Sequence, residues 1–216
     1  MKKLKLFFML PVLFLCTAAT AEAQSFAVKA NAGTTGLGLE AAYRLSEPVN
    51  LRIGANFLSA SYLYETDADD EYDLDASLKL GLITALADWH PFRNSFRLTA
   101  GLVYNSNTIS GDLLPKKSYT IGGDVYTPED LGSLSSEFTF NPIAPYLALG
   151  FGNAFSGSRF GVNMDLGLIF QGPPKVSLEA EGLLSPSAAQ APILEDNVSW
   201  ATLYPVLTLS FTYRIN

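Results

Sequence analysis

The sequence predicts an all-β fold, an eight-stranded antiparallel transmembrane β-barrel, on three observations. Apolar residues recur at every second position along most of the chain, and short connections alternate with long ones. No apolar run of about 18 residues follows the first 25 positions, so a membrane helix beyond the N-terminus is not expected. Hydrophobic residues make up 48% of the 216 positions and charged residues 16%. A chain of this composition needs a large core or a lipid-facing surface.

The N-terminus has the pattern of a secretory signal peptide. Lysines within the first five positions precede an apolar stretch at 6–16, and a small-x-small cleavage motif ends at Ala23. We therefore expect residues 1–23 to be cleaved and residues 24–216 to form the barrel. Cys16 is the only cysteine and leaves with the signal peptide, so the mature chain has neither disulfides nor thiolate metal sites.

The charge balance argues against nucleic acid as a partner. The whole chain carries a net charge of −7. Because residues 1–23 hold three lysines and one glutamate, the mature part carries −9. An acidic chain without a basic run is not suited to binding nucleic acid.

The alternation is clearest at 96–105, 160–171 and 203–215, and it has the period of a strand. Such strands fit a soluble sandwich or lipocalin-like barrel with an apolar inside, or a membrane barrel with an apolar outside. The strands are long, often 12 residues or more, and the positions between the apolar ones are rich in small and polar residues. Aromatic residues such as Trp89 and Tyr213 lie near strand ends, as in an interfacial girdle. These features favour the membrane barrel.

The connections give the strand count and the orientation. Short turns are expected at 46–49, 91–94 and 155–158, and longer polar loops at 65–71, 110–137 and 183–199. Short turns face the periplasm in such barrels and long loops face outward, so both termini are expected in the periplasm. A tight hairpin at 33–35, and one long strand running through 172–174, bring the count to eight.

Alternation places ten charged residues inside the barrel: Lys29, Glu40, Arg44, Arg52, Asp73, Asp75, Lys79, Arg97, Asp165 and Arg214. Because buried charges must pair to be tolerated, opposite signs are expected to meet. The hypothesis is a mixed-charge network that closes the barrel, formed by Glu40, Arg52, Lys79, Arg97 and Asp165. The alternative is that the interior charges line a gated ion path.

Four stretches of the chain are similar to a known family. They are Gly33-Thr34-Thr35-Gly36-Leu37-Gly38-Leu39-Glu40, Asp88-Trp89-His90-Pro91-Phe92, Ala144-Pro145-Tyr146-Leu147-Ala148-Leu149-Gly150-Phe151-Gly152 and Leu209-Ser210-Phe211-Thr212-Tyr213-Arg214. Over essentially the whole mature chain, the sequence resembles small proteobacterial outer membrane proteins of the OmpA-like and OmpW-like barrel superfamily. The resemblance implies insertion into the cell outer membrane by its assembly machinery. Outer membrane lipid and lipopolysaccharide are the expected surroundings, and the protein is expected to be a monomer. The chain departs from the family's usual aromatic end, because it finishes with Ile215-Asn216.

No motif indicates a catalytic site. A Ser-His-acid site needs a histidine beside the nucleophile, but the only histidine, His90, lies in a predicted periplasmic turn, and GxSxG does not occur. The acidic stretch at 67–75 lacks the spacing of an EF-hand. We therefore expect no enzyme activity, metal or cofactor. A structural or surface-interaction role is the expected function; the alternative is a narrow channel for ions or small hydrophobic molecules.

Overall fold

The computed structural model describes residues 26–64 and 72–215. The predicted cleavage site after Ala23 and most of the acidic stretch 67–75 lie outside the described residues. In the described part of the chain, no helix is long and apolar enough to cross a membrane. The main element is an antiparallel sheet of eleven strands.

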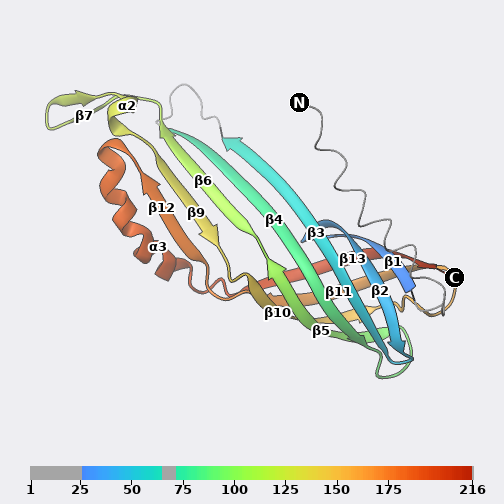
Figure 1. Ribbon diagram of the computed structural model, residues 1–216. Helices are drawn as coiled ribbons and strands as arrows, with labels where there is room; N and C mark the ends of the chain where they lie inside the picture. Colours follow the sequence, from blue (N-terminus) through green and yellow to red (C-terminus); the bar gives the residue numbers. More distant parts are fainter. Residues whose placement is uncertain (1–25, 65–71, 216) are drawn as a thin grey trace, which may run out of the picture.

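Eight strands of this sheet close into a ring (Figure 1). Each pairs with the next in the order β1-β2-β3-β4-β5-β10-β11-β13, and β13 pairs with β1, with Phe26 opposite Ile215. The ring strands are β1 (Phe26–Gly33), β2 (Gly36–Ser46), β3 (Val49–Tyr64), β4 (Tyr72–Trp89), β5 (Phe96–Asn105), β10 (Ile143–Phe151), β11 (Phe160–Phe170) and β13 (Leu203–Ile215). The predicted tight hairpin near 33–35 is confirmed, since β1 ends at Gly33 and β2 begins at Gly36. We call the end of the ring at Phe26 and Ile215 the terminal end.

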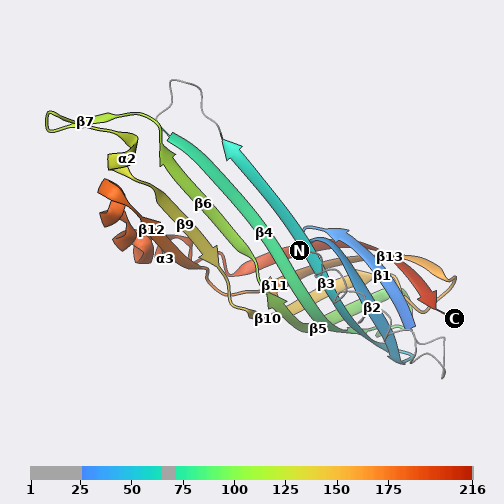
Figure 2. The ribbon, with the colours of Figure 1, turned by 45° about the horizontal axis from the view of Figure 1, so that its top comes forward.

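At its other end the ring continues on one side as a smaller sheet, which we call the extension (Figures 1 and 2). Its strand order is β3-β4-β6-β9-β12, with β6 (Thr108–Pro115), β9 (Leu134–Thr139) and β12 (Lys175–Ala180). The helices η2 (Gly182–Gln190) and α3 (Ala191–Val198) lie beside β12. The backbone N–H of Val176 donates to the carboxylate of Glu195 at 3.1 Å. The helices thus cover a strand edge that would otherwise invite pairing. A small hairpin of β7 (Tyr119–Ile121) and β8 (Asp124–Tyr126) and the short α2 (Pro128–Leu131) lie near the far end.

The extension corrects two expectations about connections. The segment 110–137, predicted as a loop, contains much of β6 and β9, which pair with each other. The single strand predicted through 172–174 is two strands: β11 pairs within the ring, whereas β12 pairs with β9. Gly172, with φ of +72°, lies at this break. The two strands separate there because each finds its backbone partner on a different strand.

Side chains alternate between the outside and the inside of the ring. Outward apolar side chains are largely exposed, for example 65% for Leu39 and 70% for Phe211. The face predicted for each residue is confirmed on β5, β11 and β13.

On β4 the predicted faces are reversed, both in the ring and in the extension. Leu86 lies opposite the inward Arg52, and Leu82 lies opposite the inward Asn56. Directly opposed residues of an antiparallel pair share a face, so both leucines point inward. The outward positions there are Ile83, Ala85, Ala87 and Trp89. The prediction takes its parity from 72–82, where the odd positions are polar, and most of this stretch lies in the extension, whose polar side faces outward.

Candidate functional site

Among the described residues, six charged side chains from six strands are buried inside the ring. They are Lys29 (β1), Glu40 (β2), Arg52 (β3), Asp88 (β4), Arg97 (β5) and Asp165 (β11). None is more than 6% exposed. Three cations and three anions make the set electrically neutral, as burial of charge requires. We call these six residues the interior network.

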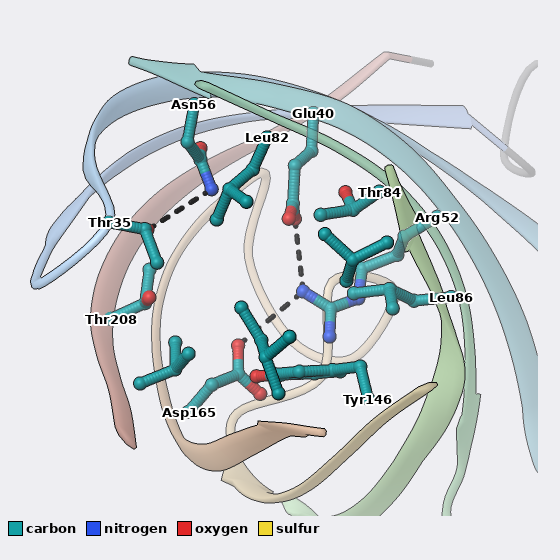
Figure 3. A pocket seen from close by; sticks show the side chains of 13 residues that line it. Thr35, Glu40, Arg52, Asn56, Leu82, Thr84, Leu86, Tyr146, Asp165 and Thr208 are labelled. Atoms are coloured by element: carbon teal, nitrogen blue, oxygen red, sulfur yellow. Dashed lines mark hydrogen bonds and ion pairs between the residues drawn. The ribbon is translucent and has the colours of Figure 1, made fainter. Parts of the chain in front are cut away.

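Arg52 is the centre of the interior network (Figure 3). Its Nη1 lies 3.0 Å from Glu40 Oε2 and 3.4 Å from Asp165 Oδ2. Its Nε lies 2.9 Å from Asp88 Oδ2. One guanidinium thus contacts carboxylates from β2, β4 and β11, and it crosses the inside of the ring.

Arg97 and Asp165 form the shortest ion pair of the interior network. Arg97 Nη2 donates to both carboxylate oxygens of Asp165, at 2.7 and 2.8 Å. Gly150 on β10 lies directly opposite both residues. A Cβ at this glycine would lie 2.6 Å from Arg97 Nε and 2.7 Å from Asp165 Oδ1. The missing side chain therefore leaves the space in which the pair forms.

One more ion pair joins Lys29, the sixth member, to this centre, and a threonine supports Asp88. Lys29 Nζ lies 3.3 Å from Glu40 Oε2. The hydroxyl of Thr99 donates to Asp88 Oδ1 at 2.7 Å. The charges thus form one connected set rather than isolated pairs, and charge-assisted contacts of this kind are strong in a dry interior.

An apolar layer covers the interior network on the side of the extension. Leu82, Leu86 and Val103 are buried there, packed against Tyr146 and Ile169. A cavity of about 20 Å³ lies between this layer and the network, next to Arg52 and Asp165 (Figure 3). This is room for about one water molecule.

At the terminal end, the turn between β10 and β11 folds into the mouth of the ring. Phe155 is buried beside Ala27 and Ala42. Arg44 lies over the Phe155 ring, 4.9 Å from its centroid, and Arg214 donates to the Phe155 carbonyl at 3.1 Å. Both arginines were predicted as interior charges. In the structure they hold the β10–β11 turn, with its buried Phe155, in the mouth of the ring.

Four of the five residues in the hypothesised network come together: Glu40, Arg52, Arg97 and Asp165. Lys79 does not, and its assignment to the interior was wrong. It is exposed on the outward face of the extension, opposite Ser59 of β3 and Thr108 of β6.

The assignments of Asp73 and Asp75 to the interior were wrong for the same reason. Their odd positions on β4 face outward, and Asp73 pairs with Lys116 at 2.6 Å. Both residues belong to the extension, where β4 has left the ring.

Sequence reasoning missed Asp88 and left Lys29 outside the network. Asp88 escaped notice because the faces of β4 were reversed. The girdle residue Trp89 was a usable signal, because its outward side chain requires its neighbour Asp88 to point inward. Among the described residues, no group of three His, Cys, Asp or Glu side chains is placed to hold a metal ion.

The ring and its filled interior define a class of protein, and comparison with solved structures supports it. No family model and no curated protein sequence matches the chain. The crystal structure of Acinetobacter baumannii CarO2 matches with a TM-score of 0.57 and 22% identity, and CarO of the same organism with 0.57 and 19%. Each match covers 88% of this chain and 97% of the other. These neighbours are outer membrane β-barrel proteins, so the fold supports that class and an outer membrane location. The matches do not place the chain in the OmpA-like or OmpW-like superfamily.

Proposed function

We propose that this chain is an integral outer membrane β-barrel protein whose eight-stranded interior is closed by side chains, with a structural or surface-interaction role. The observation that carries the proposal is the neutral interior network. Arg52 and Arg97 contact carboxylates from several strands, all buried, across the space through which a solute would pass. Eight-stranded barrels are in general filled by their own side chains.

The outside of the ring supports the membrane part of the proposal. The outward side chains of β11 are Phe160, Val162, Met164, Leu166, Leu168 and Phe170, and all are exposed. A soluble protein rarely leaves so large an apolar surface uncovered. Lipid covers such a band in a membrane barrel, and the polar interior is the expected counterpart.

The proposal contains no enzymatic role. His90, the only histidine, is 1% exposed at the terminal end, directly after β4. A buried imidazole cannot meet a substrate from solution. We propose that the chain works as a monomer among outer membrane lipid and lipopolysaccharide, after insertion by the assembly machinery.

Conductance of the purified mature protein in planar bilayers tests the closed interior. The wild type is expected to show little or no conductance. Asp165→Ala is expected to raise it, because Arg52 and Arg97 lose a shared partner. Asp196→Ala, on the exposed surface of α3, is the matched control and should leave conductance unchanged. A wild type that passes ions or small hydrophobic molecules freely, with no change in Asp165→Ala, would favour the narrow channel instead.

A further inference from the structure

The outward face of the sheet changes from apolar to polar where the ring passes into the extension. On β4 the outward residue is Ile83 in the ring and Lys79 in the extension. On β3 the change falls between the exposed Phe57 and Ser59. The strand register aligns an apolar row (Ala55, Ile83, Tyr104 and Ile143), then Phe57 opposite Gly81, and then the first fully polar row (Ser59, Lys79, Thr108, Thr139 and Lys175). In a membrane barrel, such a boundary marks the level where hydrocarbon gives way to headgroups.

Two further rows on this face are made mostly of serines and carboxylates, with Leu63 at the register position opposite Asp75. The second row is Ser61, Ser77, Ser110, Glu137 and Ser177, and the third contains Asp75, Asp112, Ser135 and Glu179. The opposite face differs at the same height, where one row reads Leu78, Ile109, Phe138 and Val176. The polar character is therefore specific to the outward face. We call these three rows the polar face.

The charges on the polar face are ordered along the strands, counted from the ring outward. The two lysines, Lys79 and Lys175, lie in the row nearest the apolar band, and the carboxylates lie farther out. Asp75 and Asp112 are directly opposite each other on neighbouring strands, an arrangement that destabilises a sheet unless a cation lies between them. A hollow of about 290 Å³ lies beside them, lined by serines together with Asp112, Glu137 and Glu179.

This order of groups matches the chemistry of one partner, the lipopolysaccharide of the outer leaflet. Its phosphates lie closest to the hydrocarbon, where lysine ammonium groups can contact them directly. The acidic sugars lie above and are accompanied by divalent cations. Carboxylate oxygens are hard ligands that can share such a cation with the sugar acids, and serine hydroxyls can hydrogen-bond to sugar hydroxyls.

We propose that the polar face is a docking surface for the phosphorylated, acidic saccharide headgroup of lipopolysaccharide, held in part through shared divalent cations. The inference rests on the proposed function, because membrane insertion of the ring puts this face at headgroup height. Two observations carry it: the face continues directly from the lipid-facing surface, and its lysine and carboxylate rows follow the order of charges in the partner.

Binding of fluorescent rough lipopolysaccharide to the folded mature protein in a zwitterionic detergent tests the proposal. A neutral-face variant combines Asp75→Asn, Asp112→Asn, Glu137→Gln and Glu179→Gln. Its control removes four exposed carboxylates elsewhere, by Glu47→Gln, Asp124→Asn, Glu129→Gln and Asp196→Asn. For wild type and control, the affinity for lipopolysaccharide in millimolar Mg²⁺ should fall about tenfold when EDTA replaces the metal. A tenfold change in affinity corresponds to about 1.4 kcal/mol of binding free energy. The neutral-face variant should bind equally weakly in both buffers.

A second pair of variants tests the lysine row. Lys79→Gln with Lys175→Gln should weaken binding in Mg²⁺ and in EDTA alike, because lysines contact phosphates without a metal. Arg93→Gln, at the terminal end of the ring, should bind as the wild type does.

Three outcomes would overturn the proposal. Equal binding by wild type, the neutral-face variant and the lysine variant would show that the face does not contact lipopolysaccharide. Equal affinity for anionic phospholipid micelles would show attraction to negative charge without recognition of the saccharide. In both cases, wild-type protein that still inserts into phospholipid vesicles would leave the proposed function standing. Failure to insert into any vesicle would refute the proposed function and, with it, the docking surface.

Discussion

Arg97 and Asp165 meet over Gly150: the arginine on β5 and the carboxylate on β11 are joined across the intervening strand β10, at 2.7 Å. This contact is possible because the middle strand has no side chain at that position. It links sequence positions 68 residues apart into one buried pair.

Gly150→Ala should destabilise the protein by about 1–3 kcal/mol, the usual cost of an added methyl group in a packed interior. The new Cβ would lie within 2.8 Å of atoms of both Arg97 and Asp165. Urea unfolding of protein folded in lipid vesicles measures the change. Gly161→Ala is the matched control, because its Cβ would meet its nearest neighbour, in Thr212, at an ordinary 3.9 Å. Equal losses in the two variants would contradict the role assigned to Gly150.

Asp165→Ala should reduce the free energy of unfolding by about 3–5 kcal/mol, since it leaves buried arginines without a shared partner. The same urea titrations measure it. Replacement of the exposed Asp196 by alanine should stay within about 0.5 kcal/mol of the wild type. A small loss for Asp165→Ala would mean that the remaining carboxylates, Glu40 and Asp88, neutralise the arginines by themselves.

Leu168→Arg should cost roughly 2–4 kcal/mol if this outward position faces the bilayer core. Ser59→Arg places the same charge outward on β3 in the first polar row, and it should cost close to nothing. Refolding titrations into lipid vesicles compare the two variants. No penalty at Leu168 would argue against a lipid-facing surface and in favour of a soluble barrel.

Burial lowers the pKa of His90 below its ordinary value. The nearby Asp88 carboxylate raises this pKa in part, and the Arg97 cation lowers it further. Because the unfolded chain binds the proton more readily, stability should fall as the pH drops below about 6.5, the ordinary histidine pKa. His90→Gln should remove this part of the pH dependence. The free energy of unfolding, measured from about pH 7.5 to about pH 5.5, checks the prediction. Carboxylates change the stability of variant and wild type alike over this range, so they do not affect the comparison. Parallel curves for variant and wild type would contradict it.

Cleavage between Ala23 and Gln24 remains a prediction from the motif that ends at Ala23. N-terminal sequencing of the protein recovered from outer membrane fractions should read Gln24 first. Recovery of chains that begin at Met1 would show an uncleaved segment. Replacement of Ala21 and Ala23 by bulky residues should block processing, whereas the same change at Ala19 should not.

The strands and their two faces follow largely from the sequence, because a strand turns successive side chains to opposite sides. On β11, Leu166 and Leu168 face outward and Asp165 faces inward, as predicted. The inward positions of Glu40, Arg52 and Arg97 follow from the same alternation. Their charges then require partners, so a buried network could be expected before any contact was known.

The tertiary structure alone decided which strands meet and in what register. β4 pairs with β5 along Leu82–Trp89 and with β6 along Tyr72–Lys79, and alternation within β4 does not encode this change of partner. The change of partner builds the extension that carries the polar face, and the pairing of β4 with β3 turns Asp88 inward and Lys79 outward. Alternation records only which side a residue faces, whereas hydrogen-bonded register between distant strands sets its neighbours and whether it lies in the ring or in the extension.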